Sequence, residues 1–76
     1  MRPADLASAV SVRTSLASHA ARQSRETAGV TAADIARVIG VTRQSVSAWE
    51  NGREVPTIPH ALAYGRALAA LIPKAA

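Results

Sequence analysis

The chain has 76 residues, with nine Lys plus Arg, five Asp plus Glu and no cysteine, so its formal net charge is +4 at pH 7. This length suits one small domain, and the lack of cysteine excludes disulfides, thiol catalysis and thiolate zinc sites. The basic balance favours a polyanionic partner, although a soluble domain with no such partner can carry the same charge.

Several classes of function are disfavoured by what the sequence lacks. No apolar run reaches the roughly 18–20 residues of a membrane span, and the first ten residues do not read as a signal peptide. His19 and His60 are far apart and have no partners at metal-ligand spacing. There is no glycine-rich phosphate loop and no convincing Ser-His-Asp set. We therefore expect a soluble cytoplasmic protein that is not an enzyme and has no metal, cofactor or small-molecule ligand.

The first predicted element is a helix over residues 3–12, with Pro3 in its first turn. Leu6 and Val10 form an i, i+4 apolar pair, which predicts an inward side. The Ser and Thr residues that follow weaken helix propensity, so we expect a break and an N-terminal helical arm over residues 1–13. One longer helix is the alternative. The arm either covers the edge of the core or contacts DNA or a second copy of the chain.

The second predicted helix covers about residues 14–28, and Gly29 ends it. Its inward side consists mainly of small residues, and its other side is polar. A third helix follows over residues 31–39. Thr31 is its expected N-cap, and Asp34 stands three residues later, where a capping box usually has Glu or Gln.

The most informative stretch joins the helix at residues 31–39 to another at residues 42–51. Each half has apolar residues at intervals of three or four, so each has one stripe to bury. Gly40 can end the first helix in a left-handed conformation, and Thr42 can cap the second. The outer face of the second helix carries donors and almost no acid: Arg43, Gln44, Ser45 and Ser47. A helix with such a face is suited to reading base edges in a DNA groove.

A loop with an Asn-Gly pair and two prolines follows. The last predicted helix covers residues 58–72, with Thr57 as its N-cap. Gly65 inside this helix costs about 1 kcal/mol relative to Ala, and close contact with another helix backbone is the expected compensation. Pro73 ends the helix, and residues 73–76 form a tail.

The register of the central stretch depends on several constrained positions together: Ile35, Ala36, Ile39, Gly40, Val41, Val46 and Trp49, followed by Glu50-Asn51-Gly52. With these residues the chain resembles the lambda-repressor/Cro family of phage and bacterial helix-turn-helix regulators, also called the XRE family. The resemblance implies an all-α, lambda-repressor-like bundle of four to five helices. It makes residues 14–72 the DNA-binding domain, in a bacterial cell or a phage-infected host.

In this family the second helix of the motif enters the major groove, and the first crosses the DNA backbone. The resemblance implies that four residues contact bases: Arg43, Gln44, Ser47 and Ala48. It places six residues on the sugar-phosphate backbone: Thr31, Ala32, Thr42, Ser45, Asn51 and Arg53. Arg suits guanine, Gln suits adenine, and Ala48 could touch a thymine methyl. A phosphate contact is the alternative for Arg43.

Two further features come from the family pattern. Many relatives have Gln where this chain has Ala32, so the contact there would depend on Thr31 and on backbone N–H groups at the helix end. The family also pairs the acid at Glu50 with an arginine in the preceding helix, and Arg25 matches that position. We expect a structural ion pair between Arg25 and Glu50, and a core position for Trp49.

The function implied is a sequence-specific transcriptional regulator of double-stranded DNA, a Cro-like repressor that inserts the helix Thr42–Asn51 in the major groove. A single small module covers only about 600–1,000 Å², so we expect a homodimer on a two-fold operator, formed through the terminal helix or the N-terminal arm. The alternative is an antitoxin-type protein-interaction module that also represses its own operon, because one fold can serve both uses. A DNA-bending architectural protein is a weaker variant.

Overall fold

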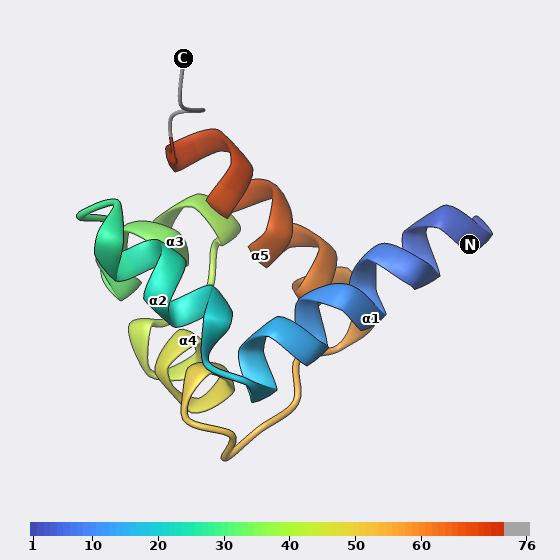
Figure 1. Cartoon of the computed structure of the whole chain (residues 1–76), viewed down its shortest axis with the longest axis horizontal. Helices are drawn as coiled ribbons and strands as arrows, with labels where there is room; N and C mark the ends of the chain where they lie inside the picture. The colour runs from blue at the N-terminus through green and yellow to red at the C-terminus, as the bar shows by residue number, and fades with distance from the viewer. Residues whose placement is uncertain (73–76) are drawn as a thin grey trace.

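The computed structural model describes residues 1–72, and in this range the chain forms five helices and no strand. The helices are α1 (Pro3–Ala17), α2 (Ala20–Thr27), α3 (Ala32–Ile39), α4 (Arg43–Glu50) and α5 (Ile58–Leu71). Figure 1 shows α1 beside the first part of α5, with the N-terminal turns of α1 extending away from the other helices. The predicted all-α helix-turn-helix class is confirmed. The predicted tail at residues 73–76 lies outside the described residues.

The break between the first two helices is not where the sequence predicted it. α1 continues to Ala17, and the Thr14 hydroxyl bonds back within the helix, donating to the Val10 carbonyl oxygen at 3.0 Å. The chain turns instead at Ser18 and His19, and His19 has a left-handed φ of 65°. The helices expected over residues 3–12 and 14–28 are therefore replaced by α1 and α2.

The inward side of α1 also differs from the prediction. Leu6 and Val10 are 46% and 50% exposed, whereas Ala9 is completely buried. Buried Ala9 and Leu16 and half-buried Val12 recur at helical spacing, and they form the packed side. α5 comes close at Gly65, where an added Cβ would lie 2.9 Å from a Val12 methyl carbon. The close approach expected at Gly65 is thus present, although the neighbour is a side chain.

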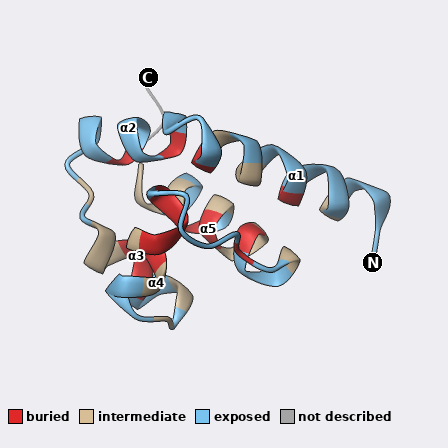
Figure 2. Ribbon diagram, turned by 90° about the horizontal axis from the view of Figure 1, so that it is seen from below, coloured by how far each residue is buried: buried red, intermediate tan, exposed pale blue. Residues whose placement is uncertain are grey.

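The core lies where α3, α4 and α5 meet below α1 and α2. Figure 2 shows the buried segments concentrated on the facing sides of these helices. The buried cluster consists of Leu16, Ala21, Ile35, Ala36, Val46, Trp49, Tyr64 and Ala67. None of the helices in residues 1–72 combines the length and the apolar character needed to cross a membrane. Packing on this cluster fixes the angle at which α4 presents its outer face.

Candidate nucleic-acid interface

Local hydrogen bonds define the ends of α3 and α4. The Thr31 hydroxyl accepts from the Asp34 N–H, and the Asp34 carboxylate accepts from the Thr31 N–H, both at 3.0 Å. The hydrogen bond from the Thr31 N–H is the main cause that lowers the pKa of Asp34, and the Thr31 side chain lowers it further. Gly40 ends α3 with a φ of 89°, and the Thr42 hydroxyl accepts from the Ser45 N–H at the start of α4. The turn between the helices therefore consists of residues that end α3 and cap the start of α4.

The outer face of α4 is open. Arg43 and Gln44 are exposed, and Ser47 is half-buried. Within residues 1–72 the ion pairs are Arg22–Glu26, Arg25–Glu50 and Arg37–Asp34. Neither Arg43 nor Arg53 has an acidic partner there, so both guanidinium groups are available to an anion or a base edge.

Ala48 is the most buried of the four residues predicted to contact bases. Only 9% of its surface is exposed, so its methyl group has little area to offer a thymine. The loop after α4 folds back on this point of the helix. The amides of Arg53 and Glu54 both donate to the Ala48 carbonyl oxygen, at 2.9 and 3.2 Å.

The six residues expected on the sugar-phosphate backbone lie at the starts of α3 and α4 and after the end of α4. Four of them are exposed (Thr31, Thr42, Asn51 and Arg53), and Ala32 and Ser45 are half-buried. The start of α3 is the least favourable of these places for a phosphate, because the Asp34 carboxylate already occupies the Thr31 N–H. The hydroxyl oxygens of Thr42 and Ser45 lie 3.1 Å apart at the start of α4.

A buried polar network ties the last residue of α4 to two other helices. Arg25 donates through Nε and Nη2 to the two carboxylate oxygens of Glu50, each at 2.8 Å, and Nη1 donates to the Val30 carbonyl oxygen. The Tyr64 hydroxyl donates to Glu50 Oε2 at 2.7 Å. In the described part of the chain no buried side-chain nitrogen or oxygen lacks a partner. The ion pair expected from the family pattern is present in this network.

Tyr64 and His19 are members of this site that the sequence did not indicate. Burial and the adjacent Glu50 carboxylate raise the pKa of Tyr64 well above its usual range. His19 Nδ1 lies 3.1 Å from the Glu50 carbonyl oxygen, which holds the α1–α2 turn against the end of α4. The spacing of Tyr64 from Ala61 and Ala67, which are also buried, was the available signal for an inward tyrosine.

Arg22 is a second residue that the sequence did not indicate. Its Nη1 donates to Asn51 Oδ1 at 3.3 Å, and its Nε lies 3.3 Å from a carboxylate oxygen of Glu26. Asn51 Nδ2 in turn donates to Ser47 Oγ at 3.1 Å. A chain of polar contacts therefore runs from α2 to the outer face of α4.

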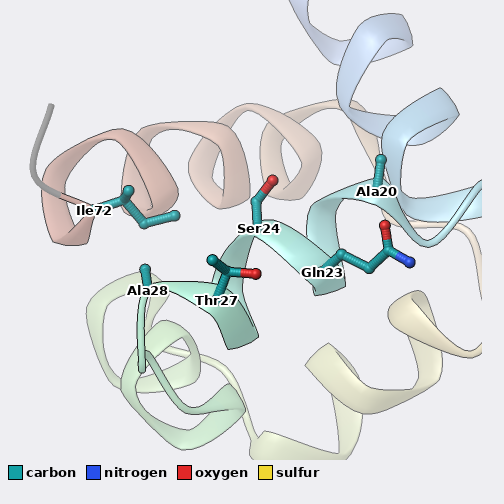
Figure 3. A pocket seen from close by; sticks show the side chains of 6 residues that line it. All are labelled: Ala20, Gln23, Ser24, Thr27, Ala28 and Ile72. Carbon is teal, nitrogen blue, oxygen red and sulfur yellow. The ribbon is translucent and has the colours of Figure 1, made fainter. Parts of the chain in front are cut away.

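A surface groove lies elsewhere, between α2 and the end of α5. This open groove of about 610 Å³ is lined by Ala20, Gln23, Ser24, Thr27, Ala28 and Ile72. Figure 3 shows these side chains around the opening, and none of them is charged. Within residues 1–72 no three His, Cys, Asp or Glu side chains are grouped so as to hold a metal ion.

Comparison with known proteins adds an independent observation. A sequence model described as a helix-turn-helix domain matches residues 16–73, which include the α3–turn–α4 unit. Searches of curated proteins and of solved structures returned no significant match. The matched range covers most of the chain, and the chain belongs to the helix-turn-helix domain family, whose members are typically DNA-binding.

Proposed function

We propose that the protein is a sequence-specific transcriptional regulator of double-stranded DNA, a Cro-like repressor of the phage and bacterial XRE type. It inserts α4, with its caps Thr42 and Asn51, into the major groove. The observation that carries this proposal is the outer face of α4. There Arg43 and Gln44 are exposed without an acidic partner at the start of the helix, while Glu50 anchors its other end.

The base contacts are assigned by chemistry and position. Arg43 reads guanine through two parallel hydrogen bonds to N7 and O6, and Gln44 reads adenine through N6 and N7. Ser47, one turn further along α4, adds a single hydrogen bond. The remaining contacts position the protein without reading sequence, and they come from Thr31, Ala32, Thr42, Ser45, Asn51 and Arg53.

A homodimer on a two-fold operator completes the proposal. Leu6 and Val10 lie one turn apart on α1 and are exposed on the proposed arm over residues 1–13. The end of α5, with half-buried Leu71 and Ile72, is the other surface for this contact. A dimer would double the area that one small module can bury on DNA.

Selection of binding sites from a randomised DNA pool tests the proposal, followed by affinity measurements at about 150 mM salt. Arg43→Ala and Gln44→Ala should each relax preference at one base position by about 1–3 kcal/mol. Arg53→Ala should weaken binding to all sequences alike and reduce the salt slope by about one. Arg66→Ala, which removes the same charge from exposed α5 surface, is the matched control. Recovery of no preferred sequence would contradict the proposal.

An antitoxin-type module that also represses its own operon is the second candidate. Exposed Leu6, Val10 and Val38 favour it, because they offer apolar surface to a protein partner. Coexpression with the protein encoded beside it, followed by size-exclusion chromatography, separates the two candidates. A stable complex would support the antitoxin role, and separate elution would count against it.

A further inference from the structure

The polar chain Arg22–Asn51–Ser47 has fixed donor and acceptor roles, which follow from the chemistry of its first member. A guanidinium group only donates hydrogen bonds. The Asn51 atom that faces Arg22 at 3.3 Å must therefore be the amide oxygen. The amide NH₂ group of Asn51 then faces Ser47, and Nδ2 donates to Ser47 Oγ at 3.1 Å.

The role of Ser47 follows in the same way. Its Oγ accepts from Asn51, so its own hydrogen must point away from Asn51. Within residues 1–72 the Ser47 hydroxyl is not the donor in any side-chain hydrogen bond, and its one such contact is the bond it accepts from Asn51. Ser47 lies on the outer face of α4 between Arg43 and Asn51, and a group that covers this face would leave the hydrogen unpaired unless it provides an acceptor.

We infer that Arg22 is a positioning residue that makes Ser47 a hydrogen-bond donor toward the base it meets. The inference rests on the proposed insertion of α4 in the major groove. The acceptors available there are N7 of either purine, O6 of guanine and O4 of thymine, whereas cytosine presents only the N4 donor. Ser47 should therefore select against cytosine on the strand it faces. Arg22 sets this preference from α2 through Asn51.

Two variants change the donor and acceptor roles in different ways. Arg22→Ala frees the Asn51 amide to turn over, so the Ser47 hydrogen can bond to Asn51 and no longer needs an acceptor on the DNA. Discrimination against cytosine should then fall by roughly threefold to tenfold. Asn51→Asp keeps the size of the side chain and its contact with Arg22, but its carboxylate accepts from Ser47. Ser47 then turns only lone pairs toward the DNA, and the preference should shift toward the donors of cytosine N4 or adenine N6.

The test is site selection with the wild type, Ser47→Ala, Arg22→Ala and Asn51→Asp, with circular dichroism of each variant to establish folding. Ser47→Ala identifies the base pair that Ser47 contacts, as the position of the DNA site at which base preference is lost. The frequency of cytosine at this position is then compared among the wild type and the other variants. Arg22→Ala and Asn51→Asp should change that position in the wild-type background and leave it unchanged in the Ser47→Ala background. Arg66→Ala controls for the loss of charge, which lowers affinity without changing base preference.

The outcomes separate this inference from the proposed function. A wild type that selects no sequence contradicts the proposed function itself. A wild type that selects a site and keeps the same profile in Arg22→Ala and Asn51→Asp overturns only the role of Arg22. Cytosine at the position sensitive to Ser47→Ala overturns it too, as does a profile change of equal size in the Ser47→Ala background.

Discussion

At the scale of single residues, Glu50 is the side chain on which the geometry of the interface depends most. It is buried at the end of α4, and its carboxylate accepts from Arg25 on α2 and from Tyr64 on α5. Its backbone carbonyl oxygen contacts His19 between α1 and α2. Burying a carboxylate is costly unless it is paired and hydrogen-bonded. This residue therefore stabilises the fold only as a member of the complete network.

Replacing Arg25 by Ala should be among the most destabilising changes in the chain. It leaves the Glu50 charge buried without its cation, which costs about 3–5 kcal/mol. Such a loss is comparable to the total stability of a marginal domain, about 5–15 kcal/mol. Urea unfolding followed by circular dichroism measures it. The double variant Arg25→Met/Glu50→Leu should recover much of the loss, and equal stability of Arg25→Ala and wild type would contradict this account.

Replacing Tyr64 by Phe removes one donor to Glu50 and should cost about 1.5–3 kcal/mol, as for a hydrogen bond to a charged group. The pKa of Tyr64 is raised in the folded state, so its contribution is fully present below its unfolded pKa of about 10. As the pH rises above that value the contribution is lost. Unfolding at pH 7, 9 and 10.5, monitored by Trp49 fluorescence, should show a steeper alkaline loss for the wild type than for Tyr64→Phe. Parallel curves would be evidence against the buried hydroxyl.

At the scale of helices, the contact between α1 and α5 depends on the absence of a side chain at Gly65. Val12 of α1 occupies the space in which a Cβ would lie. Valine has little freedom to rotate away, because it is branched at Cβ. The small residue therefore sets how closely the two helices approach.

Gly65→Ala therefore shows whether the steric cost of a Cβ at this position exceeds the gain in helix propensity. Propensity alone predicts a gain of about 1 kcal/mol, but the Cβ would be 2.9 Å from a Val12 methyl carbon, and we expect a net loss. Adding Val12→Ala should relieve the overlap, so that the two substitutions show a favourable coupling of at least about 0.5 kcal/mol in a double-mutant cycle. A Gly65→Ala protein more stable than wild type in thermal unfolding would show that α5 can move away.

The helices also show which parts of the fold were predictable. The ends of α3 and α4 are set by local caps at Thr31, Gly40 and Thr42, and the sequence contains all three signals. The α1–α2 break depends on His19 contacting Glu50, which is distant in the sequence, so local propensity placed it too early. The donor-rich face of α4 could be predicted from the spacing of the apolar residues in the sequence. Burial of Ala48 was not predictable in this way, because it depends on tertiary packing around α4.

At the scale of the whole molecule, the start of α1 contributes little to the packed body. Apart from half-buried Asp5, residues 1–8 are exposed, and Ala9 is the first residue that is fully buried. Figures 1 and 2 show these turns projecting beyond the other helices. Stability should therefore be concentrated between Ala9 and the end of α5.

Deleting residues 1–7 should change the free energy of unfolding by less than about 1 kcal/mol, because exposed surface far from the core contributes little. Leu16→Ala in the same helix should cost about 2–5 kcal/mol, as for other buried leucines. Both are measured by urea unfolding. If the deletion were as costly as Leu16→Ala, the first turns of α1 would have to pack on the body of the protein in solution.

The separation between the anchoring residues and the exposed residues of α4 affects how this protein could change over evolutionary time. Val46, Trp49 and Glu50 hold the helix in place, whereas Arg43 and Gln44 are exposed and make no ion pair in the described part of the chain. Substitutions at exposed positions of this kind usually alter stability by no more than about 0.5 kcal/mol. A lineage could therefore exchange Arg43 and Gln44 repeatedly while the scaffold stays folded. On the proposed interface, each exchange would move the protein to a new operator, so target choice can diverge faster than structure.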